Sequence, residues 1–110
     1  MAWIILLCAA VFEIGWAVGL KYTHGFTRLL PTVGTIAASI ASFWLLALAA
    51  KSLPIGTAYA VWTGIGAAGT ALLGMFLFQE SRDWGRLVCL TLIVSGVVGL
   101  KLLTTENPLP

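Results

Sequence analysis

Glu13 is a carboxylate in the middle of an apolar run that covers residues 3–20. An ionisable group at membrane depth costs roughly 2.5–3.5 kcal/mol on insertion scales, and such groups usually face a bundle interior or a water-filled cavity. The other three acidic residues, Glu80, Asp83 and Glu106, lie in predicted connections or in the C-terminal tail. Glu13 is therefore the candidate for handling a proton or a cation.

The helix face around Glu13 follows from its spacing, because residues three and four positions apart lie side by side. This face contains Ala9, Ala10, Trp16 and Ala17. The three alanines leave room for another helix or for a ligand. Ordinary packing explains Trp16 about equally well, but its position one turn from the carboxylate favours a binding role.

A second polar group lies in the third apolar run, where Tyr59, Trp62 and Thr63 share a helix face. A tyrosine hydroxyl can donate to a carboxylate, and tryptophan offers an N–H donor and a cation-attracting ring. In the second run, Ser42 is a candidate hydrogen-bond partner for Glu13. A bond from Ser42 to the backbone of its own helix is the alternative.

Small residues recur every fourth position in the third run, and they predict a surface that lets helices approach closely. They are Gly56, Ala60, Gly64 and Ala68. The pair Gly64 and Gly66 also weakens the helix locally, and we predict a hinge there.

The composition shows which elements must position these residues. The chain has 110 residues, of which 60% are hydrophobic and 9% charged, whereas soluble domains carry about 25% charged residues. It is therefore predicted to be an all-α integral membrane protein with one domain, residues 1–110. Four runs match the roughly 20 residues that a membrane-spanning helix needs. They are 3–20, 31–50, 55–78 and 85–103, and a short polar tail follows at 104–110.

Several other classes of site and function are disfavoured. Cys8 and Cys89 are far apart and fit no disulfide framework or metal spacing, and His24 has no second ligand nearby. No phosphate-binding loop or nucleophile–base pair occurs, so we expect no enzyme activity, no metal and no cofactor. A net charge of +2 is too small to suggest nucleic-acid binding. The first run has no basic segment before it, which argues against a cleaved signal peptide.

The orientation of a membrane protein is set by the distribution of Lys and Arg residues between the short loops on its two sides. In this chain that distribution specifies the orientation only weakly. Lys51 and Lys101 lie on one side, and four basic residues lie on the other: Lys21, Arg28, Arg82 and Arg86. This small excess leans towards both termini outside, and it permits both orientations.

A second copy of the chain would help to enclose a transport pathway, since four helices do so poorly alone. Secondary transporters often combine two inverted repeats around a midplane site, and this chain contains no internal repeat. Two copies in opposite orientation would mimic one. The fourth run offers a surface for such contact, a small-residue stripe made of Leu92, Ser95, Gly96 and Gly99.

The chain resembles the small multidrug resistance family over nearly its whole length. The resemblance rests on Glu13, the loop Gly25-Phe26-Thr27-Arg28 and the segment 53–66, LPIGTAYAVWTGIG. Trp16, the triplet Trp62-Thr63-Gly64 and the triplet Gly99-Leu100-Lys101 are most similar to the guanidinium-exporter branch. One departure is Ala10, a position that is often glycine in that branch, and it predicts a change in how the pocket packs.

This resemblance implies an antiparallel, dual-topology homodimer in a bacterial inner membrane, surrounded by lipid, that exports guanidinium in exchange for protons by alternating access. Protons and the cation would compete for Glu13 of both subunits. The residues implied to line the pocket are Trp16, Ser42, Tyr59 and Trp62. Lys101 is either a direct participant or an anchor at the membrane surface.

Two other functions remain open. The first is a broader exporter of quaternary ammonium or substituted guanidinium compounds, for which the small residues of the second run could open to an alkyl tail: Gly34, Ala37, Ala38 and Ala41. The second is a non-transporting membrane partner subunit that uses Glu13 for assembly. This second function would leave the aromatic residues near Glu13 unexplained.

Overall fold

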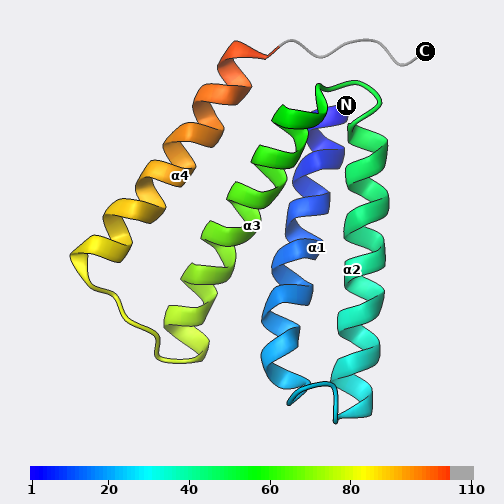
Figure 1. Cartoon of the computed structure of the whole chain (residues 1–110), viewed down its shortest axis with the longest axis vertical. Coiled ribbons are helices and arrows are strands. Elements are labelled where there is room, and N and C mark those ends of the chain that lie inside the picture. Colours follow the sequence, from blue (N-terminus) through cyan, green and yellow to red (C-terminus); the bar gives the residue numbers. More distant parts are fainter. Residues whose placement is uncertain (105–110) are drawn as a thin grey trace.

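The computed structural model describes residues 1–104 and contains four helices, shown in Figure 1. They are α1 (Ala2–Tyr22), α2 (Leu29–Ala49), α3 (Ile55–Leu77) and α4 (Trp84–Leu103). Each is long and apolar enough to cross a membrane. The predicted all-α fold with four spans is therefore confirmed, and the predicted tail lies outside the described residues from position 105 onward.

The helix bounds differ from the sequence-based ranges by at most two residues at each end. α1 continues to Tyr22, and α2 begins at Leu29, two positions before Pro31. A proline fits there because the first N–H groups of a helix have no intrahelical partner. Pro54 directly precedes α3 as its N-cap residue.

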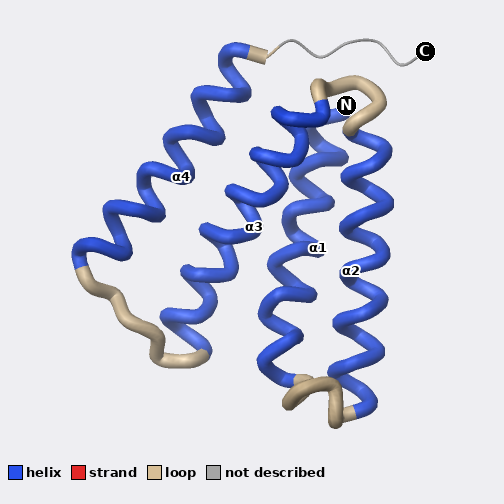
Figure 2. The backbone as a smooth tube through the Cα atoms, in the orientation of Figure 1, coloured by secondary structure: helices blue, strands red, loops and turns tan. Residues whose placement is uncertain are grey.

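α1, α2 and α3 lie side by side, and α1 packs against both of the others. α4 packs against α3 and slants away from the other helices. Figure 2 shows that the α1–α2 and α3–α4 connections lie at one end of the molecule. The α2–α3 connection and the N-terminus lie at the other end, so each helix runs the length of the molecule.

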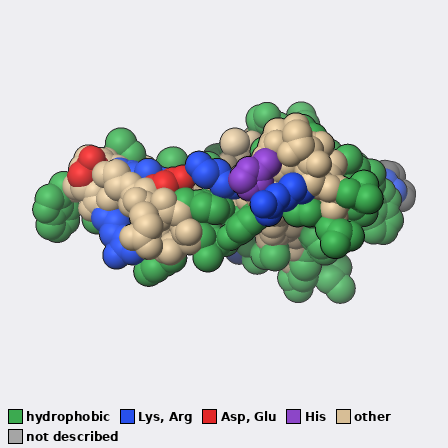
Figure 3. Space-filling model, turned by 90° about the horizontal axis from the view of Figure 1, so that it is seen from below, with side chains coloured by type: hydrophobic (Ala, Val, Ile, Leu, Met, Phe, Trp, Pro, Cys, Tyr) green, Lys and Arg blue, Asp and Glu red, His purple; other side chains and the backbone are tan. Residues whose placement is uncertain are grey.

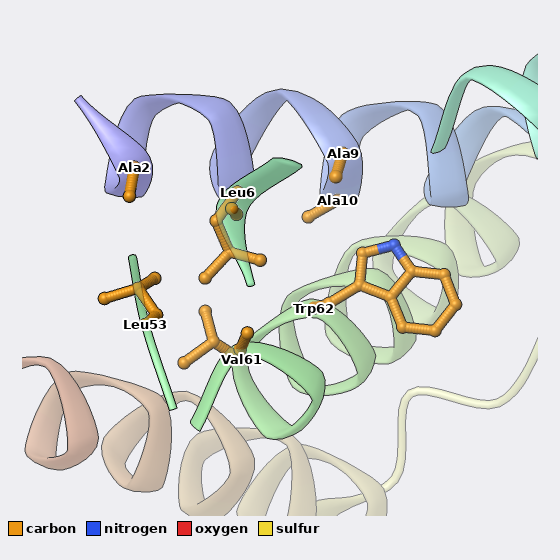
Figure 4. Close-up of a cluster of buried hydrophobic side chains, with 9 residues drawn as sticks. Ala2, Leu6, Ala9, Ala10, Leu53, Val61 and Trp62 are labelled. Carbon is orange, nitrogen blue, oxygen red and sulfur yellow. The ribbon is translucent and has the colours of Figure 1, made fainter. Parts of the chain in front are cut away.

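The core lies between the first three helices and consists mostly of small or branched side chains. Leu6 and Val61 are fully buried, and Leu53, Trp62 and five alanines belong to the same cluster, which Figure 4 draws. α4 contains no buried residue in the described part of the chain. A single chain therefore uses three helices to form its interior and leaves the fourth largely exposed.

The connection at residues 23–28 is stabilised by hydrogen bonds of its own threonine hydroxyl groups. Thr23 donates from Oγ1 to the carbonyl of Leu20 over 2.8 Å and accepts from the Phe26 N–H at 3.2 Å. Thr27 donates to the carbonyl of His24 at 2.8 Å. Gly25 has a φ of +71°, a conformation that glycine adopts without steric cost. These bonds hold α1 and α2 close together at this end.

Candidate functional site

Glu13 points from α1 towards α3 and lies directly against Gly66. A Cβ atom added to Gly66 would overlap the Glu13 carboxylate, so the absence of a side chain at position 66 makes room for it. The Oε1 atom of Glu13 is buried and has no hydrogen-bond partner among the described residues. A buried acceptor of this kind is costly to leave unsatisfied, which is typical of a group that binds a proton or a ligand.

A cavity of about 410 Å³ adjoins the Glu13 side chain. α1 and α3 form its walls, with Ala17 and Val18 on one side and Thr63, Gly66 and Thr70 on the other. Its far end is formed by residues at and beyond the ends of the helices: Lys21, Gly74, Phe78, Glu80 and Arg86. The carboxylate thus stands in the wall of a space that extends to the end of the molecule.

Ser42 does not bond Glu13 in this structure, nor does it bond its own helix. Its hydroxyl donates to the carbonyl of Ala9 on α1 over 2.6 Å and accepts from Trp62 Nε1 of α3 at 2.9 Å. Ser42 is fully buried. The serine therefore joins three helices at one point, which its position in the sequence did not reveal.

Replacing Ser42 with Ala is expected to lower the free energy of unfolding by about 1–2 kcal/mol, because the buried Trp62 N–H loses its acceptor. Equilibrium unfolding in detergent, followed by tryptophan fluorescence, measures this change. Ser39→Ala is the matched control, since the Ser39 hydroxyl bonds only the Ile36 carbonyl of its own helix. The control should change stability by less than about 0.5 kcal/mol. Equal losses for the two variants would contradict the bridging role of Ser42.

Trp16, Tyr59 and Trp62 belong to a row of aromatic rings that crosses three helices. Phe43 on α2 lies between the two tryptophans, with ring centres 6.4 Å from Trp16 and 5.4 Å from Trp62. Tyr59 follows at 5.6 Å from Trp62. Sequence reasoning missed Phe43, although its position next to Ser42 was an available signal.

The four residues of this aromatic row are not among the residues that line the Glu13 cavity. Of the five predicted binding residues, only Glu13 is among the residues that line the cavity. Tyr59 is 55% exposed and Phe43 is 52% exposed. The Nε1 atom of Trp16 is buried and has no partner within residues 1–104. One side of the row is thus open in the single chain.

The predicted supporting residues have three different environments. Ala10 is fully buried in the core cluster, so an added methyl group there affects helix packing directly. Thr63 lines the Glu13 cavity. Lys101, near the end of α4, places Nζ 4.7 Å from the centre of the Trp3 ring, which is within the range of a cation–π interaction.

The glycines of the predicted hinge lie within one continuous helix, α3. A Cβ atom on Gly64 would lie 2.7 Å from Cγ2 of Val97 on α4, so this glycine permits the close approach of that helix. Gly66 gives room to Glu13 in the same way. Both glycines therefore have a packing role, and the hinge stays a prediction.

The predicted interface stripe on α4 is largely uncovered by the other helices of its own chain, although Ser95 lines a groove with Ala68 and Leu72 of α3. Leu92 is 66% exposed, and a Cβ atom on Gly96 or Gly99 would meet no atom within 4 Å. Ser95 is exposed as well. The stripe is thus available to a second chain or to lipid.

Comparison with known proteins adds to this geometry. Residues 1–93 match the sequence profile of the family described as Small Multidrug Resistance protein. A protein named Guanidinium exporter from Yersinia pseudotuberculosis serotype I (strain IP32953) is 60% identical over 102 residues, which cover 93% of this chain and 98% of the relative. A protein of the same name from Citrobacter freundii is 59% identical over 104 residues, which cover 94% and 99%.

The match covers the elements that build the site. It includes the whole of α1, α2 and α3 and the first half of α4, and therefore Glu13, the aromatic row and the cavity walls. The alignments with the two relatives extend over nearly all of both chains. With its four membrane-length helices and this match, the chain belongs to the small multidrug resistance family.

Proposed function

We propose that this chain exports guanidinium or small guanidinyl cations in exchange for protons, and that it works as an antiparallel homodimer. The observation that carries the proposal is the Glu13 carboxylate, which stands in a cavity wall with a buried oxygen and no hydrogen-bond partner within residues 1–104. The name of the two relatives, Guanidinium exporter, supports the choice of cargo. The four membrane-length helices and the family make the chain a multi-pass protein of the bacterial inner membrane.

The chemistry of the cation suits a carboxylate. Guanidinium is planar and carries N–H donors around its edge, and a carboxylate accepts two of them in parallel. A proton on the same carboxylate removes its charge and one of its acceptors. Protons and guanidinium therefore exclude each other from Glu13, and this competition couples their movements when the empty, unprotonated dimer changes sides slowly.

A second copy of the chain would complete the site. Tyr59, Phe43 and the α4 stripe leave large apolar or aromatic surfaces open in one chain, and the Trp16 N–H lacks a partner among the described residues. In the proposed dimer, Trp16, Ser42, Tyr59 and Trp62 line a pocket shared by the two Glu13 carboxylates. Leu92, Ser95, Gly96 and Gly99 form the contact between the two α4 helices.

A transport assay on purified protein tests the exchange. In proteoliposomes with a pH-sensitive dye inside, an inward guanidinium gradient should drive protons outward, and the rate should saturate with guanidinium concentration. Empty liposomes and a gradient of sodium chloride of equal strength are the controls. Protein that is folded and dimeric in detergent but moves no protons would contradict the proposal and favour a non-transporting partner subunit.

The size of the cavity favours one alternative cargo. A volume of about 410 Å³ is larger than an ion of four heavy atoms needs, and this leaves room for a substituent if the partner chain does not fill it. Competition between guanidinium and tetrapropylammonium in the same assay separates the two. Strong inhibition and transport of tetrapropylammonium would indicate a broader exporter.

A further inference from the structure

A second carboxylate, Glu80, lies at the far end of the Glu13 cavity. Glu80 and Arg86 both line this cavity, and Arg86 Nη2 donates to Glu80 Oε1 over 2.7 Å. Figure 3 views the end of the molecule that carries the α1–α2 and α3–α4 connections, and acidic and basic side chains lie next to each other on it. The cavity therefore leads from a carboxylate at its far end to the carboxylate of Glu13, whose Oε1 atom is buried.

The position of Glu80 is held by the surrounding backbone. Its N–H donates to the carbonyl of Gly74 at 3.3 Å, and its carboxylate lies so close to Gly74 that an added Cβ atom would overlap it. On the other side, the Arg86 N–H donates to Asp83 Oδ1 at 2.8 Å, which fixes the first turn of α4. The backbone N–H groups of both members of the ion pair are thus hydrogen-bonded, and both residues line the cavity.

The ion pair can exchange with solvent. The side chain of Arg86 is 30% exposed and that of Glu80 is 38% exposed, and ion pairs at this exposure contribute little to stability. The group that pairs with the Glu80 carboxylate is itself a guanidinium, that of Arg86. A carboxylate placed to receive the guanidinium of Arg86 offers the same two acceptors to a free guanidinium ion.

We propose that Glu80 is an outer binding subsite for guanidinium at the mouth of the Glu13 cavity, and that Arg86 is its built-in competitor. A cation binds Glu80 by displacing Arg86 and then passes along the cavity to Glu13. The inference rests on the proposed function and adds a binding site to it.

The other charged side chain at this end of the cavity, Lys21, supports the proposed role of Glu80 as a cation subsite. Lys21 lines the cavity too, with Nζ 5.5 Å from the centre of the Phe78 ring. Without Glu80, the charged residues at this far end of the cavity would be Lys21 and Arg86, which are both positive. Such a mouth repels a cation. Glu80 is therefore expected to raise the rate of entry most at low guanidinium concentration.

Single substitutions test the subsite through opposite effects. Glu80→Gln should raise the half-saturating guanidinium concentration roughly fivefold, as expected for the loss of one close charge, with little change in the maximal rate. Arg86→Gln should lower this concentration, because Glu80 is then free. Arg82→Gln is the matched control, since Arg82 bonds the Met75 carbonyl and is not among the residues that line the cavity. It should leave both quantities unchanged.

The outcomes separate this inference from the proposed function. If the unaltered protein shows no guanidinium-driven proton movement, the proposed function fails. If the unaltered protein is active, equal half-saturating concentrations for Glu80→Gln and the unaltered protein overturn the subsite. Shifts in the same direction for Glu80→Gln and Arg86→Gln also overturn it, because they indicate a purely structural ion pair.

A binding measurement covers the case in which a transport variant does not fold. Calorimetric titration of Glu13→Gln protein with guanidinium chloride should show weak residual binding, and Arg86→Gln in this background should strengthen it. Absence of any residual binding, or binding unaffected by Arg86→Gln, would overturn the subsite.

Discussion

Replacing Glu13 with Gln is expected to reduce guanidinium-driven proton movement by roughly 100-fold or more, because the amide neither binds a proton reversibly nor pairs with a cation. Glutamine keeps the size and shape of the side chain, so the packing against Gly66 is retained. Fluorescence of a pH-sensitive dye in proteoliposomes measures the loss, and calorimetry measures the weakening of guanidinium binding.

A second substitution separates the effect of charge from that of position. Glu13→Asp keeps the carboxylate but withdraws it by one methylene group from Gly66, and it should leave measurable exchange with a changed half-saturating concentration. Both variants must elute at the size of the unaltered protein in detergent. Exchange by Glu13→Gln at the rate of the unaltered protein would eliminate Glu13 as the shared site of protons and cation.

Replacing Gly66 with Ala is expected to lower the rate of exchange roughly tenfold while leaving the free energy of unfolding nearly unchanged. The new methyl group would occupy the space of the Glu13 carboxylate. The carboxylate is the free end of a flexible side chain, so it can move aside at little energetic cost. A displacement of about 1 Å at a reacting group can cost on the order of 100-fold in rate, which makes function more sensitive than stability here.

Gly56→Ala is the matched control, because the same change on the same helix meets no atom within 4 Å. It should retain the exchange rate of the unaltered protein. Transport assays and thermal unfolding in detergent are run on both variants. Unimpaired exchange by Gly66→Ala would show that the close approach of Gly66 to Glu13 has no part in transport.

The sequence alone determined the class of the protein and the number of its spans. Hydrophobic length is a local property, and in lipid a segment of that length must satisfy its backbone groups within itself as a helix. Glu13 stood out for the same reason, since a charge at membrane depth is costly wherever the helix packs. The helix ends were predicted within two residues because prolines and charged residues mark them.

Only the tertiary structure decided which residues meet. Helical spacing placed Trp16 beside Glu13, yet Trp16 contacts Phe43 on α2, whereas Glu13 lies against Gly66 on α3. Ser42 bonds Ala9 and Trp62 rather than the carboxylate. The pairing of Glu80, which lies in a connection, with Arg86, which lies in the first turn of α4, was not expected from the sequence.

The physical reason is that these helices are apolar on nearly every side. A helix of a soluble protein shows its buried face by an apolar stripe, but a membrane helix carries no such stripe because lipid is as apolar as its neighbours. The close packing of small residues then decides which face of each helix contacts its neighbours. Gly64 against Val97 and Gly66 against Glu13 are such contacts, and they are known only once the helices are placed together.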